Sequence, residues 1–215
     1  MEVHLHILPP AQRSLWPDLV GIPDHFVLYG GTAVALRCGH RTSRDFDFFS
    51  SVPFAPGDLR ARLIWLEDEQ TLQSKANTLT VVVDRGVPVK VSFFGGLHLG
   101  RVGQPERTPD GVLRIASLHD LAATKAAVIQ QRAEKRDYLD LAALLQAGVR
   151  LADALGGASA LYGEMFNAMI SLNALSYFKD GDLSELGAET QTLLAAAAAA
   201  VRTIPAIRRS ADEIG

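Results

Sequence analysis

Residues 25–49 read HFVLYGGTAVALRCGHRTSRDFDFF, and this stretch limits the fold more than any other part of the chain. It opens with an apolar and aromatic run that is typical of a buried strand and that ends at Gly30 and Gly31. A short helix is expected next, over residues 32–38, with Thr32 as its cap. A strand that turns directly into a helix indicates a mixed α and β architecture.

The run DFDFF predicts a second strand whose two faces differ in chemistry. Strand side chains alternate, so Asp45 and Asp47 share one face while Phe46 and Phe48 share the other. Two neighbouring carboxylates are oxygen ligands of the kind that Mg²⁺ accepts, and Mg²⁺ commonly completes its shell with water and substrate phosphates. The alternative is a strand with one solvated face, which alternation alone also predicts.

The remaining pattern separates a β-rich first half from a helical second half. In the first half a helix is expected over 58–67, followed by a hairpin of strands 78–84 and 88–94, which gives a sheet of at least four strands. From Ser117 onward the pattern is helical, and the expected helices span 118–132, 137–146, 150–155, 158–175 and 183–203. The chain is therefore predicted to be α+β, with a mixed sheet flanked by helices and a helical C-terminal portion.

Composition excludes several classes of protein. Of the 215 residues 48% are hydrophobic and 21% are charged, which suits a folded globular chain rather than a disordered one. The net charge of −3 and the pI of about 6.1 argue against the broad cationic surface that phosphate-driven nucleic-acid binding needs. With one cysteine, no secretory signal and no long apolar run, a cytoplasmic protein without a membrane span is expected.

The residues around the two aspartates suit a polyphosphate. Gly30 and Gly31 precede a helix N-terminus, where backbone N–H groups and the helix dipole favour an anion. Further hydroxyl and guanidinium contacts to the same polyphosphate are expected from nearby residues, namely Thr32, Arg41, Ser43 and Arg44. The predicted ligands are thus Mg²⁺ or Mn²⁺ and a nucleoside triphosphate.

Four ordered motifs carry a family resemblance over nearly the whole chain. They are LYGGTAVALRCGHRTSRDFDFF, VKVSFFGG, DLAATKAAVIQQRAEKRDYLDLAALL and LSYFKDGDLSEL. In order and spacing they resemble the AbiEii/AbiGii toxin family of the nucleotidyltransferase superfamily, which belongs to type IV toxin–antitoxin and abortive-infection systems. The resemblance implies a nucleotidyltransferase core over residues 1–110 and a helical subdomain over 111–215 that packs on the core and closes the cleft.

The resemblance also assigns roles to individual residues. Gly30, Gly31 and Ser43 match nucleotide-phosphate positions, and Asp45 and Asp47 match the metal ligands.

Two further catalytic residues follow from the later motifs, Lys125 from the third and Asp137 from the fourth. Lys125 falls inside the apolar stripe of its predicted helix, so it needs a partner or an anion unless it reaches water at the edge of the stripe. Asp137, taken by itself, is first a helix N-cap, with Asp140 one turn later less involved.

One expected feature is missing. Nucleotidyltransferases of this superfamily commonly carry a third carboxylate on a later strand, but the strand PVKVSFF offers only Lys90 or Ser92, and Asp84 is a weak substitute near the turn. Two acids justify one magnesium–nucleotide complex and do not justify a second metal.

The function that follows is transfer of a nucleoside monophosphate to a hydroxyl acceptor. RNA, including the tRNA 3′ end, is the acceptor that the resemblance suggests, with an antitoxin protein as a partner, while a protein hydroxyl or a small molecule remains an alternative acceptor. For an RNA acceptor we expect a local basic rim, formed by Arg37, Arg41, Arg44, Arg132, Lys135 and Arg136.

Two alternatives remain open. The chain either binds nucleotide or a partner without catalysis, because it lacks the third acid, or uses its helical half as an interaction surface. Met165, Phe166, Met169 and Tyr177 motivate the second alternative, although such residues at helical spacing more often belong to a core.

Overall fold

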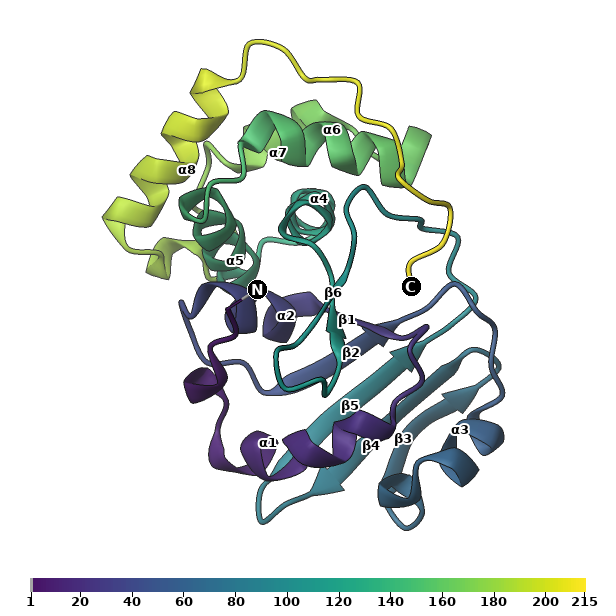
Figure 1. Ribbon diagram of the computed structural model, residues 1–215. Helices are drawn as coiled ribbons and strands as arrows, with labels where there is room; N and C mark the ends of the chain where they lie inside the picture. Colours follow the sequence, from purple (N-terminus) through teal and green to yellow (C-terminus); the bar gives the residue numbers. More distant parts are fainter. Residues whose placement is uncertain (1) are drawn as a thin grey trace. The chain divides into compact units, whose positions relative to one another are not determined.

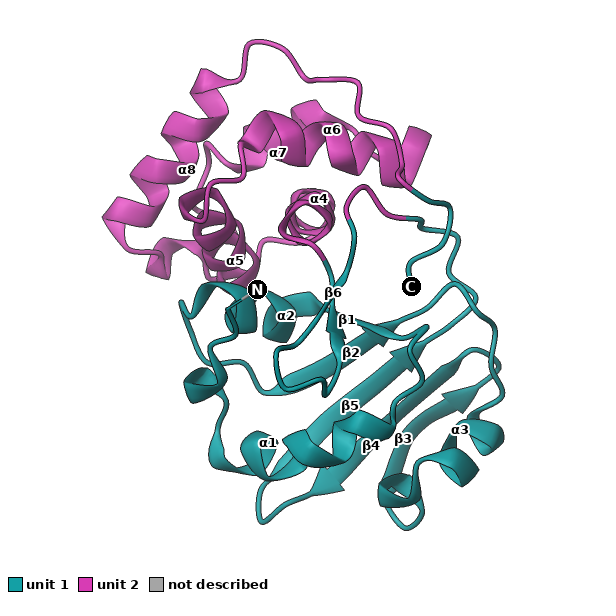
Figure 2. Cartoon of the chain, viewed as in Figure 1, with its two compact units in different colours: residues 1–100, 104–116, 211–215 teal, residues 101–103, 117–210 magenta. Residues whose placement is uncertain are grey.

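Strands and helices separate along the chain into two units. The computed structural model describes residues 2–215, and of these the first unit contains residues 2–100, 104–116 and 211–215 (Figures 1 and 2). The second unit contains residues 101–103 and 117–210. The change from one unit to the other therefore falls at 116/117, six residues beyond the expected boundary, and the last five residues return to the first unit.

The first unit is built on a seven-stranded mixed sheet with strand order β3-β4-β5-β2-β1-β7-β6. The strands are β1 (Val27–Tyr29), β2 (Asp45–Phe49), β3 (Gln70–Lys75), β4 (Thr78–Asp84), β5 (Pro88–Phe94), β6 (Glu106–Arg107) and β7 (Arg114–Ile115). β2 runs antiparallel to β1 and parallel to β5, while β4 and β5 form the predicted hairpin. These pairings place β2, with its two aspartates, near the middle of the sheet.

Helices surround this sheet, and aromatic side chains fill its core. They are α1 (Pro10–Leu15), α2 (Gly30–Cys38), α3 (Pro56–Arg62) and the 3₁₀ helices Leu5–Ile7, Trp16–Gly21 and Ile64–Leu66. In Figure 1, α1 lies across the sheet where β4 and β5 run. Phe46, Phe48 and Phe93 are fully buried, and Trp16 lies 6.4 Å from Phe46 between ring centroids. The apolar face of β2 is thus covered, which leaves the acidic face for the site.

The second unit is entirely helical. Its elements are α4 (Leu118–Ile129), α5 (Lys135–Gln146), α6 (Leu151–Tyr162), α7 (Ala168–Ala174), α8 (Ala188–Ala200) and the 3₁₀ helices Gly163–Met165 and Leu183–Glu185. α4 packs against α5, α6 and α7. Ser117, the residue from which the sequence indicated helical pattern, caps α4 by accepting a hydrogen bond of 3.0 Å from the Asp120 amide. The α+β class is confirmed.

A glycine pair that was expected to break a helix instead lies inside α6. A Cβ atom at Gly156 would come within 2.4 Å of the Pro205 carbonyl oxygen, and one at Gly157 within 3.1 Å of the Ala123 Cβ. Gly156 therefore allows close packing against the backbone at Pro205, and Gly157 allows close packing against Ala123 of α4. The structure has α6 and α7 in place of the expected helices 150–155 and 158–175.

Several other expected boundaries were wrong. α2 begins at Gly30 rather than at a Thr32 cap, and α3 ends at Arg62, five residues early. α5 begins at Lys135, so Asp137 lies within its first turn and is not the N-cap. The strand β3 was not expected at all.

Candidate functional site

The two aspartates of β2 share one face of the sheet, as the alternation predicted. Asp45 and Asp47 are partly buried, whereas Phe46 and Phe48 on the opposite face are inaccessible. β2 is hydrogen-bonded along both edges, by β1 and by β5. The carboxylates consequently project from a strand that cannot shift easily.

The glycine turn lies directly against Asp47. Gly30 has a positive φ of 70°, which L side chains rarely adopt, and a Cβ atom there would lie 2.9 Å from the Asp47 Oδ2. The first turn of α2, whose backbone N–H groups have no carbonyl partner within the helix, therefore starts beside this carboxylate. Only glycine permits so close an approach of the backbone to the Asp47 carboxylate.

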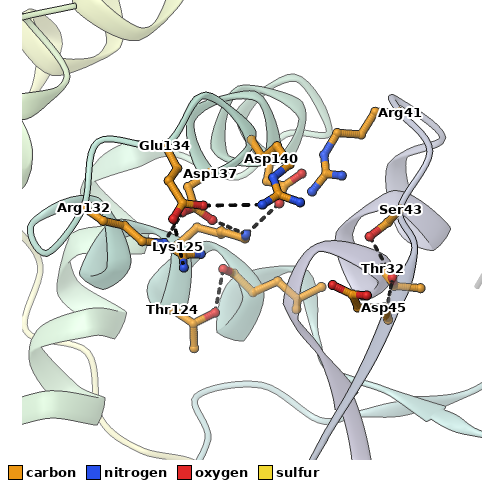
Figure 3. Close-up of polar contacts among 12 residues, drawn as sticks. Thr32, Arg41, Ser43, Asp45, Thr124, Lys125, Arg132, Glu134, Asp137 and Asp140 are labelled. Carbon is orange, nitrogen blue, oxygen red and sulfur yellow. Dashed lines mark hydrogen bonds and ion pairs between the residues drawn. The ribbon is translucent and has the colours of Figure 1, made fainter. Parts of the chain in front are cut away.

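Thr32 holds the loop that leads into β2. Its hydroxyl is buried, lies 2.8 Å from the Ser43 Oγ and also contacts the Asp45 carbonyl oxygen (Figure 3). Any contact of Thr32 with phosphate must replace these hydrogen bonds. The single hydroxyl hydrogen of Thr32 goes to the Asp45 carbonyl oxygen, which can only accept, so the Ser43 hydroxyl donates to the Thr32 Oγ1. A contact of Ser43 with phosphate must therefore replace this hydrogen bond. Arg41 donates to the Thr42 carbonyl at 2.9 Å.

The expected basic rim is weaker than the sequence suggested. The Arg37 side chain is 6% exposed, and it donates to Glu106 at 2.8 Å and to the Ala116 carbonyl at 3.0 Å. It is therefore a structural residue of the first unit and not a rim residue. Lys135 pairs with Glu185 at 3.1 Å, while Arg44 and Arg136 are exposed.

β5 carries a lysine and a serine where a third acid was sought. The parallel register aligns Lys90 with Asp45 and Ser92 with Asp47, so all four residues belong to one sheet face. The Lys90 Nζ lies 3.0 Å from the Asp45 Oδ2. Asp84 instead accepts a hydrogen bond of 2.8 Å from the Gly86 amide and so serves the hairpin turn.

A buried charged cluster lies within the second unit. The Lys125 Nζ contacts the Asp137 Oδ1 at 2.7 Å and the Asp140 Oδ2 at 2.6 Å, and the Arg132 Nε donates to the Asp137 Oδ2 at 2.7 Å (Figure 3). Lys125 therefore faces inward and has two anionic partners. Asp140 contacts the Lys125 ammonium as closely as Asp137 does, although the sequence indicated that Asp140 is less involved. Its spacing of three residues from Asp137 on one helix was the available signal.

The cluster keeps Asp137 ionised. Burial raises the pKa of the Asp137 carboxyl, but the hydrogen bond from Arg132 and the charge of Lys125 outweigh it and hold the pKa below the ordinary value of 3.8. Lys125 and Arg132 offset the charges of the two buried carboxylates, and Arg132, whose side chain is 52% exposed, also pairs with Glu134 at 3.4 Å.

The predicted site residues thus form two groups, one in each unit. The structure brings together Gly30, Gly31, Thr32, Ser43, Asp45 and Asp47 in the first unit. It brings together Lys125 and Asp137 in the second.

The donor set of the first group fits one hard divalent ion. Asp45 and Asp47 supply carboxylate oxygens on one face of β2, and oxygen ligands of this kind suit Mg²⁺. Within residues 2–215 no group of three or more His, Cys, Asp and Glu residues gathers to hold a metal. None of the helices in that range has the length and apolar content needed to cross a membrane.

Comparison with known families shows which family the chain belongs to. Residues 17–208 match the model of the AbiEii nucleotidyl transferase toxin of type IV toxin–antitoxin systems. The chain belongs to this family. The AbiEii match spans the glycine turn, both aspartates of β2 and the charged cluster of the helical unit.

Two individual proteins are similar to this AbiEii member. The uncharacterized protein aq_aa25 of Aquifex aeolicus (strain VF5) is 36% identical over 138 residues, which are 62% of this chain and 65% of that protein. The match therefore spans slightly less than two thirds of the relative. The crystal structure of a candidate nucleotidyltransferase from H. pylori shares the fold at a TM-score of 0.57 and 19% identity, over 88% of this chain and 90% of that one.

Proposed function

We propose that this chain is a metal-dependent nucleotidyltransferase that transfers a nucleoside monophosphate from a nucleoside triphosphate to a hydroxyl acceptor. RNA, including the tRNA 3′ end, is the acceptor class, growth inhibition is the outcome, and an antitoxin protein is the partner. Family membership supports this reading, and the net charge of −3 points to an acceptor bound through local contacts rather than through a broad basic surface.

One observation carries the proposal. The backbone of Gly30 closes on the carboxylate of Asp47, while Asp45 projects from the same face of β2. A triphosphate needs backbone amides for its oxygens and a divalent cation for its charge, and these residues supply the first and hold the second. Mg²⁺ or Mn²⁺, when bound, neutralises the phosphate charge that develops during transfer.

The residues of the first unit divide the work. Asp45 and Asp47 hold the ion, and the amides at Gly30 and Gly31 bind phosphate oxygens. Ser43 donates its hydroxyl hydrogen to the phosphates, and Arg41 and Arg44 add guanidinium contacts to the same group, because guanidinium forks match phosphate oxygens.

The chemical step exchanges one phosphorus–oxygen bond for another. The acceptor hydroxyl oxygen forms a bond to the α-phosphorus, and the bond from that phosphorus to the oxygen bridging the α- and β-phosphates breaks. Pyrophosphate leaves with the electron pair of the broken bond, and the acceptor hydroxyl releases its proton. Lys125 and Asp137 are retained as catalytic residues on the strength of the family match.

Label transfer tests the proposal. Purified protein is incubated with Mg²⁺, total cellular RNA and each α-labelled nucleoside triphosphate in turn. The Asp45→Asn/Asp47→Asn double variant is run in parallel, with Asp68→Asn as a control that removes an exposed aspartate outside the site. We expect labelled RNA with the native chain and with Asp68→Asn only. Undiminished transfer by the double variant refutes the proposal.

A second candidate function is nucleotide binding without transfer. It is favoured by Ser92, which occupies the register position beside Asp47 where a third carboxylate was sought. On this reading the native chain binds Mg²⁺ and nucleotide, Asp45→Asn abolishes that binding, and no product forms with any of the four nucleotides or with several acceptors. The label-transfer assay separates the two functions.

A further inference from the structure

The sheet face that carries the aspartates also carries a fixed positive charge. Lys90 is aligned with Asp45 across the parallel pair β2 and β5, and its Nζ lies 3.0 Å from the Asp45 Oδ2. The two side chains are 41% and 39% exposed, so the pair forms at the surface and not within the core. An ammonium group is therefore a direct neighbour of a predicted metal ligand.

The position of this ammonium matters because Ser92, which shares this face of β5 with Lys90, carries no negative charge. Two-metal sites hold a second cation with an additional anionic ligand. Ser92, which is buried and aligned with Asp47, supplies a hydroxyl and no charge, and no third acid joins the two aspartates among residues 2–215. A second divalent ion on this face would lie beside the Lys90 ammonium instead of a carboxylate. Two neighbouring positive charges repel each other.

We propose that this site takes a single divalent ion, and that Lys90 stands as a fixed cation in place of a second one. The inference rests on the proposed function, since it concerns the same aspartates. Lys90 acts here as a positioning residue. It occupies the Oδ2 of Asp45 and so leaves the other oxygen of that carboxylate for the ion.

Counting bound ions tests this inference without any activity measurement. Mn²⁺ bound per chain is measured by electron paramagnetic resonance in the presence of a non-hydrolysable nucleoside triphosphate. We expect one Mn²⁺ for the native chain. We expect two for Lys90→Met/Ser92→Asp, because that double variant removes the fixed cation and supplies the missing acid.

Two control variants isolate the cause. Lys90→Met/Ser92→Asn has nearly the same side-chain volumes without the added acid, and we expect it to bind one ion. Lys75→Met removes another lysine of the same sheet, on the exposed strand β3, and we expect one ion with unchanged affinity. Lys90→Met alone should bind its one ion more tightly, because no ammonium then competes for Asp45.

The outcomes are distinct. Two ions in the native chain, one ion in Lys90→Met/Ser92→Asp, or weaker binding by Lys90→Met each overturn the inference while leaving the proposed function intact. The native count does not depend on whether any variant folds. No Mn²⁺ and no nucleotide bound by the native chain overturns the proposed function and this inference together.

Discussion

Replacing Lys125 with methionine tests whether the charged cluster of the helical unit holds that unit together. Methionine keeps the length and apolar character of the side chain and removes only the ammonium. The lysine side chain is 9% exposed, and those of Asp137 and Asp140 are 2% and 0% exposed, so none of the three charges is well solvated. Removing one partner of a buried ion pair typically costs about 3–5 kcal/mol.

The contacts within the cluster determine how much of the stability lost in Lys125→Met arises at Asp137 and how much at Asp140. Asp137 keeps its 2.7 Å contact with Arg132 in the variant, whereas Asp140 loses a 2.6 Å contact with the lysine. The Asp140 side chain is fully buried, so we expect part of the loss to arise there. In a Lys125→Met/Asp140→Asn double variant one of the two carboxylates that faced the ammonium is uncharged, and we expect it to be more stable than Lys125→Met alone.

Urea unfolding measures the effect, and the two tryptophans help to assign it. Both Trp16 and Trp65 lie in the first unit, so their fluorescence follows that unit, while far-UV circular dichroism follows the helices of both. With a slope of about 1.5 kcal/mol/M, a loss of about 3–5 kcal/mol lowers the midpoint of the helical transition by about 2–3 M. We expect this shift in the circular dichroism signal.

A matched variant separates the cluster from the general effect of losing a lysine. Lys135→Met removes a lysine at the start of α5, the helix that carries Asp137 and Asp140. Lys135 pairs with an exposed glutamate, and such pairs contribute about 0–1 kcal/mol. If Lys125→Met costs no more than Lys135→Met, the cluster does not stabilise the unit and the reasoning is refuted.

Three further outcomes are expected. Gly30→Ala should cost about 1–2 kcal/mol in thermal unfolding and abolish Mn²⁺ binding, because it forces a side chain into a positive φ and against Asp47, whereas Gly57→Ala, which meets no atom within 4 Å, should be neutral. Thr32→Val should cost about 1–2 kcal/mol and speed hydrogen exchange in the loop before β2; unchanged exchange would contradict its anchoring role. The ionised Asp137 stabilises the fold above the ordinary carboxyl pKa of 3.8, and this contribution is lost as the pH falls through its lower folded-state pKa, so Asp137→Asn should show a shallower loss of stability with acid than the native chain.

The sequence predicted those parts of the fold that depend on residues within a few positions of one another. The period-two alternation of DFDFF identified the two faces of β2, and Ser117 identified the start of α4, because each signal depends only on residues within a few positions. β3 was missed since all six of its residues are exposed, and a strand without a buried face has no alternation to detect.

The errors have their causes in contacts that are distant along the chain. The pair Gly156–Gly157 was interpreted as a break, but its partners Pro205 and Ala123 lie far away in sequence. Aspartate is a residue type that commonly caps a helix, and only the burial of Asp137 and its ion pair with the buried Lys125 show that it faces inward.

The candidate site also contains residues that short-range sequence pattern predicts and residues that long-range pairing places. Asp45 and Asp47 follow from alternation, and the glycine turn follows from the end of β1. The approach of Lys90 to Asp45 depends on a parallel pairing between strands that are separated by β3 and β4 in sequence, and no local pattern specifies which strands become neighbours. The sequence shows that an acid is missing and offers Lys90 or Ser92 in its place, but only the sheet register shows that Lys90 is the residue that pairs with Asp45. That difference decides the chemistry, since a merely vacant position leaves room for a second metal, whereas an ammonium ion paired with Asp45 opposes one.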